Sequence, residues 1–403
     1  MWDIAWIWAE AFLRWLHVIA GIGWIGSSFY FIHLDYSLKR REGLPERAYG
    51  EAWQVHGGGF YNMVKYLVAP ARLPDELTWF KWEAYATWIS GFALVVAVYY
   101  AGASLYLVDP AVLPISPATG IAISIAGLVL GWVVYDGLCR SSIGNNETVL
   151  AAAGFVLLVA LAYATMRVFS ARGAFMQMGA LIGTIMAANV LMVIIPGQRK
   201  VVADLIAGRT PDPAHGRRGK QRSTHNNYLT LPVVFLMISG HYPLAFATRW
   251  SWVILALLLV MGGAMRHFFN VRHQGLPSPW WSWGVAVVCG VLIVWLSTLG
   301  PALETRPRDK RADAVTAAPV SFRQVEDIVI SRCSMCHAAE PVWAGISVAP
   351  KGVLLDTPAR IKARARDIAA TSVWSSAMPP SNITDLMPHE RQALAAWFAS
   401  DRR

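Results

Sequence analysis

Charged side chains are scarce in this chain of 403 residues, since Asp, Glu, Lys and Arg together make up only 15% of it. A soluble domain usually carries about 25% charged residues, so the composition does not fit an ordinary soluble enzyme. Disorder is excluded as well, because hydrophobic residues reach 55% and aromatic residues 12%. The 19 tryptophans suit the aromatic belts at the two surfaces of a bilayer. The composition therefore predicts a membrane protein surrounded by lipid.

Cysteine is also rare, and the four cysteines exclude a disulfide scaffold by their number and spacing. Cys139 and Cys289 stand alone in apolar surroundings, which is typical of inert buried thiols. Cys333 and Cys336 are separated by two residues and are followed directly by His337. This last group is the most specific motif of the chain.

Long apolar runs account for most of the hydrophobic residues. They lie at about residues 5–34, 83–107, 119–138, 148–166, 174–196, 229–246, 250–265 and 280–301. The first run is too long for the core of a signal peptide, and no basic segment precedes it, so we expect a retained helix. The sequence thus predicts an all-α fold that begins with a polytopic membrane helix bundle of about eight spans.

The basic residues fix the expected orientation. If the N-terminus lies in the periplasm, the cytoplasmic loops contain 17 Lys and Arg, whereas the loops on the other side contain three. Positive residues favour the cytoplasmic side, so we expect a multi-pass protein of the bacterial inner membrane with both termini periplasmic. Topology then explains most of the net charge of +10, and nucleic acid is not an expected partner.

The composition changes after the last apolar run. Residues 1–301 form the predicted transmembrane domain, and 302–320 form a polar linker rich in Pro and Ala. Residues 321–403 form a second, periplasmic unit that opens and closes with short amphipathic stretches.

The sequence Cys333-Ser-Met-Cys336-His337 is the attachment pattern of a c-type haem. Two thiols at this spacing bond to the porphyrin, and the adjacent imidazole becomes an iron ligand. A zinc site would need a fourth ligand, and His389 is the only other histidine in this unit. A thioredoxin-like redox pair would need a βαβ context, which is missing. We therefore expect one covalent haem c in a small domain of the class I cytochrome c type.

Met378 is the expected sixth ligand of that haem iron. Two prolines follow it and would hold its sulfur at a fixed angle, although Met387 is a weaker rival and a packing role for Met378 is the alternative. Ligation by His and Met raises the reduction potential, so this unit is predicted to accept electrons.

Ionisable residues in the apolar runs are the candidates for function in the membrane unit, because burying them is costly. On the expected topology, Glu83, Asp136, Arg140 and Arg266 lie near the cytoplasmic side. The run His56-Gly57-Gly58-Gly59 either lets backbone N–H groups approach an anion or is only a flexible loop.

A cytoplasmic-side site and a periplasmic haem would be separated by about the 30 Å of the hydrocarbon core, which is too far for one electron-transfer step. His17 and His241 lie at a similar predicted depth nearer the periplasm. They are candidate ligands of a haem b that would act as an intermediate carrier; the alternative is two unrelated buried histidines.

Five stretches carry a resemblance to a known family. They are WLHVIAGIGWIGSSFYFIHLD (15–35), HGGGFY (56–61), LTWFKWEAYATWISGF (77–92), GWVVYDGLCRS (131–141) and RSTHNNYLTLPVVFLMISGHYP (222–243). Together with the haem motif they resemble the membrane-bound bacterial urate hydroxylase (urate oxidase) with a C-terminal cytochrome c domain. The first stretch is also similar to other haem-binding membrane families, including the membrane protoporphyrinogen oxidase type, which favours His17 as a haem ligand.

The resemblance implies the oxidation of urate to 5-hydroxyisourate in purine degradation. Electrons would pass through haem c, held by Cys333, Cys336, His337 and Met378, to a periplasmic cytochrome or a terminal oxidase. The resemblance assigns no catalytic residue in the membrane unit.

Urate is an anion at neutral pH and binds Arg or backbone N–H groups. Arg140, Arg266 and the backbone of Gly57, Gly58 and Gly59 are therefore the candidate substrate-binding groups. The candidate proton acceptors are Glu83, Asp136 and His56.

Two other functions compete with this prediction: a membrane-anchored electron-transfer subunit of a larger complex, and a redox-coupled transporter. The density of polar residues in the membrane unit favours the enzyme, because a mere anchor needs only one or two plain spans.

Overall fold

The computed structural model describes residues 2–67, 70, 72–246, 248–299, 320–343, 346–374 and 377–400, without the side chains of residues 2, 3 and 381. All but the last residue of the predicted linker, 302–320, lies outside the described residues. The described chain is mostly helical, which confirms the predicted secondary structure in its main feature.

Helices cover all eight of the apolar runs. They are α1 (Trp2–Ser37), α2 (Trp82–Leu94), α3 (Ala103–Tyr106), α4 (Pro117–Arg140), α5 (Glu147–Thr165), α6 (Ala171–Ala188), α7 (Ile195–Ile206), α8 (Pro213–Ile238), α9 (Ser251–His273) and α10 (Trp281–Ser297). The π-helical turn η1 (Val95–Tyr100) continues α2, and the π-helical turn η3 (Asn189–Ile194) joins α6 to α7.

Capping side chains explain where several of these helices begin. The Ser116 hydroxyl accepts from the backbone N–H of Thr119 at the start of α4, and the side chain of Asn146 caps α5. The Ser170 hydroxyl caps α6 in the same way. Each cap supplies an acceptor to backbone N–H groups that have no partner within the helix.

Five helical segments of the described chain are long and apolar enough to cross a membrane. They are Ile4–Ser37, Pro117–Arg140, Glu147–Thr165, Ala171–Ile206 and Ser251–His273, and the shorter α10 is apolar too. These segments are consistent with membrane association, whereas the count of eight spans stays a prediction.

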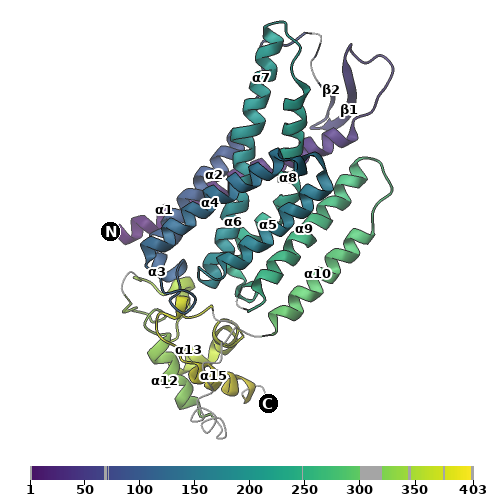
Figure 1. Cartoon of the computed structure of the whole chain (residues 1–403). Helices are drawn as coiled ribbons and strands as arrows, with labels where there is room; N and C mark the ends of the chain where they lie inside the picture. The colour runs from purple at the N-terminus through teal and green to yellow at the C-terminus, as the bar shows by residue number, and fades with distance from the viewer. Residues whose placement is uncertain are drawn as a thin grey trace.

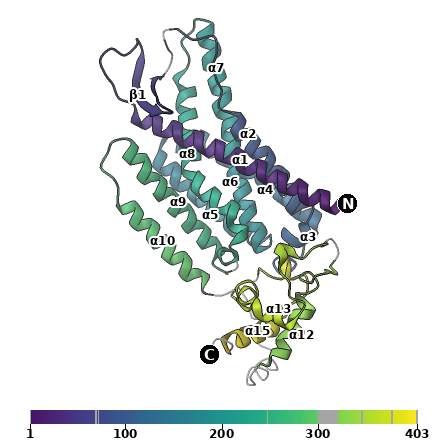
Figure 2. The ribbon, with the colours of Figure 1, turned by 180° about the vertical axis from the view of Figure 1, so that it is seen from behind.

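The core of the bundle is formed around α6. In an apolar stretch of 18 residues within Ala171–Ile206, 56% of the residues are buried, compared with 6% in such a stretch of α1. Phe175, Met178 and Ile182 on α6 are fully buried, as are Ile254 and Leu255 on α9. Figures 1 and 2 show the helices side by side, with α1 crossing one outer face of the bundle at an angle. A peripheral α1 leaves most of its apolar surface exposed.

A β-hairpin departs from the all-α prediction. Strands β1 (Ala48–His56) and β2 (Gly59–Tyr66) pair antiparallel, with Val55 opposite Phe60. Gly57 and Gly58 form the two-residue turn, and both have positive φ values, of 59° and 82°. Such a turn needs residues without a Cβ, which explains the glycine run.

The second unit forms its own small core. Its helices are α12 (Phe322–Arg332), α13 (Pro358–Ala363), α14 (Ala365–Ile368) and α15 (Pro388–Ser400). The amphipathic faces predicted from the sequence meet here, because Val325 and Val329 of α12 are buried together with Leu394 and Trp397 of α15. Figure 1 places this unit at the end of the bundle near the start of α1, whereas the hairpin and the tip of α7 lie at the opposite end.

Candidate active site and haem centre

The haem motif follows directly on α12. Cys333 is the residue after the last helical turn, and both Cys333 and Cys336 are free thiols. The Nδ1 atom of His337 lies 3.0 Å from the carbonyl oxygen of Val353. A carbonyl only accepts, so Nδ1 carries the proton and Nε2 keeps a lone pair for a metal. This donor set fits a covalent haem c with His337 as an axial ligand.

The described residues give the zinc alternative no support. They contain no group of three or more His, Cys, Asp or Glu side chains that would hold a metal ion. Burial raises the pKa of the Cys333 thiol to about 12.

The backbone at Met378 is held from both sides. Its N–H donates to the carbonyl of Thr371 over 2.8 Å, and its carbonyl accepts from Nη1 of Arg391 over 3.0 Å. Arg391 is buried and also donates to the Ser372 carbonyl and to Oδ1 of Asn382. Burial lowers the pKa of this guanidinium. Arg391 could not be identified from the sequence, because one arginine in a polar helix gives no distinct signal.

The loop that carries Met378 faces the helix bundle. The turn η8 (Pro380–Asn382) packs on α3, and the turn η7 (Ala369–Val373) packs on η5 (Pro243–Ala245). Ala377, the residue before Met378, lies against the main core of the bundle. The Met378 edge of the second unit is therefore the edge nearest the membrane unit.

A buried ion pair organises the opposite, hairpin end of the bundle. Oδ1 of Asp136 on α4 lies 2.6 Å from Nη2 of Arg222 on α8, and its Oδ2 lies 2.6 Å from Nε of Arg140. Arg222 is 3% exposed, so its charge needs this carboxylate. Both oxygens of Asp136 accept from guanidinium groups, so this carboxylate joins α4 to α8, and its catalytic role stays a prediction.

Neutral polar groups extend this network. The buried Asn189 accepts from Arg222 and donates to the hydroxyl of Tyr135 and to Oδ1 of Asn226. The Tyr135 hydroxyl lies 2.7 Å from Nδ1 of His225. Asn189 stands in the middle of an apolar run without a charge to mark it, and so it was missed in the sequence.

Arg266 on α9 forms a second buried cationic centre and has no Asp or Glu in ion-pair distance among the described residues. Its Nε donates to Oδ1 of Asn227 over 3.3 Å and its Nη2 to Oδ1 of Asn270 over 3.0 Å. The guanidinium carbon lies 3.8 Å from the ring centre of Phe29 on α1. The Nδ2 atom of Asn227 is buried without an acceptor. A buried cation beside an unpaired N–H donor is an arrangement that suits an anion.

The next residues of the same two helices also meet. Tyr228 follows Asn227 in α8, His267 follows Arg266 in α9, and the Tyr228 hydroxyl lies 3.2 Å from Nδ1 of His267. A group that can exchange a proton thus stands beside the cationic centre.

The other predicted substrate and proton-transfer residues are distributed over the hairpin end. Glu83, in the first turn of α2, faces α1 at Gly23, and its carboxylate forms no hydrogen bond or ion pair among the described residues. His56, Gly57 and Gly58 are exposed at the hairpin tip, and Gly59 begins β2. Gly57 and Gly58 form the tight turn of the hairpin, and no hydrogen bond joins the tip to Arg266 among the described residues, so substrate binding by this backbone stays a prediction.

The two predicted haem b ligands, His17 and His241, pack against different helices. Nδ1 of His17 on α1 lies 3.0 Å from the Thr87 carbonyl of α2, which leaves Nε2 with a lone pair. His241 is exposed in the turn η4 (Ser239–His241), which packs on α6 and α8. The orientation of His17 suits a metal ligand, and the pairing with His241 stays a prediction.

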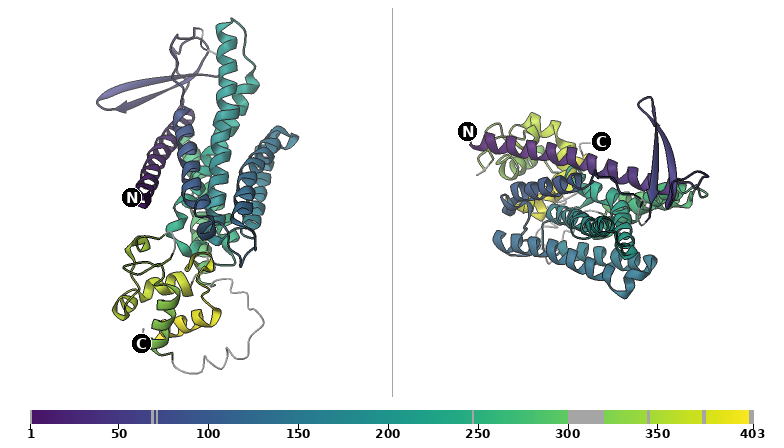
Figure 3. Two further views of the ribbon diagram at one scale, coloured as in Figure 1. Left: turned by 90° about the vertical axis from the view of Figure 1, so that its left-hand side faces the viewer. Right: turned by 90° about the horizontal axis from the view of Figure 1, so that it is seen from above.

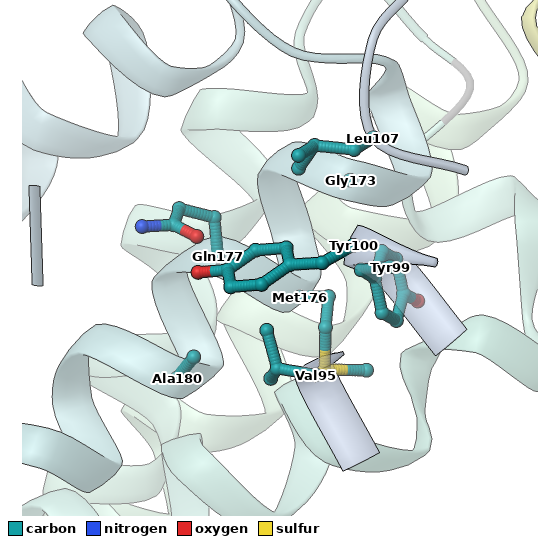
Figure 4. Close-up of a pocket in the computed structure, with 8 residues that line it drawn as sticks. All are labelled: Val95, Tyr99, Tyr100, Leu107, Gly173, Met176, Gln177 and Ala180. Atoms are coloured by element: carbon teal, nitrogen blue, oxygen red, sulfur yellow. The ribbon is translucent and has the colours of Figure 1, made fainter. Parts of the chain in front are cut away.

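Figure 4 shows a small cavity between η1 and α6. It is lined by Val95, Tyr99, Tyr100, Leu107, Gly173, Met176, Gln177 and Ala180 and has a volume of about 10 Å³. That volume holds about one water molecule, so this cavity is too small for a purine.

Comparison with known proteins connects the bundle to one family. No curated protein and no solved structure matches the chain. The model of the family described as urate oxidase N-terminal matches residues 3–297, which include the whole helix bundle up to the end of α10. The chain therefore belongs to the urate oxidase N-terminal family.

Proposed function

We propose that the protein is a membrane-bound enzyme that oxidises urate to 5-hydroxyisourate and passes the electrons to a haem c in residues 321–403. Membership of the urate oxidase N-terminal family suggests oxidoreductase activity on urate. The observation that carries the proposal is Arg266, a buried guanidinium with neutral partners only among the described residues.

Arg266 and Asn227 are the proposed binding groups for the urate anion. The guanidinium supplies charge, and the unpaired Nδ2 of Asn227 supplies one further donor. The ring of Phe29 lies against the guanidinium and holds it in place by a cation–π contact. Asp136 and Arg222 hold the neighbouring helices in place and do not contact the substrate in this proposal.

The reaction joins urate and water and releases two protons and two electrons. The pair Tyr228–His267 is the proposed first proton acceptor, because it is adjacent to Arg266 and Asn227 along both helices. Glu83 remains a second candidate, since its carboxylate forms no ion pair among the described residues.

The second unit supplies the exit for the electrons. Cys333 and Cys336 would hold the haem covalently, and His337 and Met378 would be its axial ligands. A haem c ligated in this way is a one-electron acceptor of raised potential. Packing of the Met378 loop on α3 and η5 supports electron transfer from the adjoining end of the bundle.

The test is the reduction of haem c by urate in the absence of oxygen. We expect urate to reduce the haem of the purified wild-type protein. Arg266→Gln removes hydrogen bonds to a charged group, each worth about 1.5–3 kcal/mol, and should raise the KM for urate on the order of ten- to a hundredfold. Arg272→Gln is the matched control, because Arg272 lies exposed in the last turn of the same helix.

Two results would count against the proposal. An unchanged KM in Arg266→Gln would remove the guanidinium from the substrate site. A wild-type haem c that urate never reduces would favour the alternative of a membrane-anchored electron-transfer subunit.

A further inference from the structure

The outer face of the β-hairpin exposes three neighbouring apolar side chains. Val55 stands opposite Phe60, and Trp53 shares their face because alternate residues of a strand point the same way. Their exposed fractions are 56% for Trp53, 71% for Val55 and 77% for Phe60. Exposed apolar clusters of this kind mark sites of contact with another surface.

The opposite face of the hairpin is tied to α1. The Tyr30 hydroxyl donates to Oε1 of Gln54 over 2.6 Å, and Nζ of Lys65 lies 2.5 Å from Oδ1 of Asp35. Figure 3 shows the hairpin projecting sideways from the bundle at the end of α1, beyond the helices in the view from above. Because α1 is largely exposed, lipid in an embedded protein would surround α1 and reach the base of the hairpin.

Positive charge gathers where the hairpin begins. The segment 39–47 contains four Lys and Arg and two Glu. Arg41 and Arg47 pair with glutamates, whereas Lys39 and Arg40 form no ion pair among the described residues. Arg40, Arg47 and Arg209 line an open cleft at the base of the hairpin. Such a surface is complementary to anionic headgroups.

We propose that residues 48–66 form an interfacial arm that binds anionic phospholipid of the inner leaflet. Trp53, Val55 and Phe60 insert at the boundary between headgroups and acyl chains, and Lys39 and Arg40 contact the phosphates. The inference rests on the proposed membrane embedding and orientation and not on the urate site.

The experiment places an environment-sensitive fluorophore on single cysteines in the full haem-loaded protein, in nanodiscs that contain phosphatidylglycerol. Cys139→Ala and Cys289→Ala remove the thiols outside the haem motif. Val55→Cys and Phe60→Cys report on the apolar face, and Tyr61→Cys, on the same strand but the opposite face, is the matched control. We expect labels at 55 and 60 to be quenched by brominated lipid and protected from aqueous iodide, and the label at 61 to show the reverse.

Two further measurements separate the possible causes. Val287→Cys on the exposed face of α10 reports on embedding itself, so loss of lipid quenching there would contradict the proposed membrane location. If lipid quenches the label at 287 while iodide quenches the labels at 55 and 60, the protein is embedded but the proposed interfacial arm is wrong. Protection of the labels at 55 and 60 from iodide, without quenching by lipid, would indicate that a second copy of the chain covers this face. That result would also overturn the proposed interfacial arm.

The lipid class is tested by charge. Lys39→Gln with Arg40→Gln, or nanodiscs of phosphatidylcholine only, should reduce lipid quenching at 55 and 60 and leave it unchanged at 287. Equal quenching under all these conditions would contradict recognition of anionic lipid.

Discussion

At the scale of residues, three buried arginines differ in what neutralises them. Arg222 lies against the carboxylate of Asp136, so its charge is already compensated. Arg266 and Arg391 meet only neutral oxygens among the described residues. A compensated arginine stabilises the fold. Arg266 keeps a positive field that we propose acts on the substrate, and Arg391 holds the backbone of the Met378 loop by hydrogen bonds.

Arg391 is predicted to position the sixth haem ligand. Arg391→Gln leaves buried carbonyl groups at Ser372 and Met378 without a donor, at a cost of about 1–3 kcal/mol for each group. The loop should loosen and the Met378 sulfur should leave the iron for part of the time. The expected readouts are a lower reduction potential of haem c and a weaker near-infrared band of the iron–sulfur bond.

Arg364→Gln is the control for this prediction, because Arg364 forms an exposed pair with Asp367 in the same unit. The control should keep the potential and the band of the wild type. If Arg391→Gln also keeps both, Arg391 serves only the packing of the second unit.

At the scale of elements, the helices could be predicted from the sequence because apolar runs and caps are local signals. The hairpin was missed, since its strands mix Trp53, Val55 and Phe60 with charged residues and carry no long apolar run. The glycine run after His56 had two interpretations, and only the positive φ values identify it as a turn.

The candidate site residues also differ in whether the sequence alone could identify them. Cys333, Cys336 and His337 lie in one short motif, so the haem site can be predicted from the sequence alone. Arg266 could be singled out as a candidate because a charge in an apolar helix is costly. Its partner Asn227 belongs to another helix and is uncharged, so the pairing only becomes visible when α8 and α9 pack.

The contact between α1 and α2 depends on a glycine. A Cβ at Gly91 would lie 2.7 Å from Cε1 of His17, so Gly91→Ala must displace the imidazole or separate the helices. We expect a loss of about 1–3 kcal/mol, seen as a lower Tm in detergent. Gly284→Ala on α10 is the control, because a Cβ there meets no atom within 4 Å. Equal Tm values for the two variants would contradict this account of the interface.

At the scale of the whole molecule, the proposed substrate site and the second unit, with the proposed haem c, lie toward opposite ends of the bundle. Arg266 is near the last turns of α9, on the side of the hairpin, whereas the Met378 loop packs on α3 and η5 at the other end. The electrons must therefore cross most of the bundle, which is the reason to expect a second carrier such as a haem b at His17.

The number of electrons that the protein accepts from urate tests this arrangement. Urate yields two electrons, and the single Cys-x-x-Cys-His motif provides for one haem c, which takes one. With haem c alone, an anaerobic titration should end at about half a molecule of urate per chain; with an additional haem b it should end at about one. A pyridine haemochrome spectrum of the same sample counts both haems independently. An end point at half a molecule with haem b present would show that this haem lies off the electron path, and His17 would then need another role.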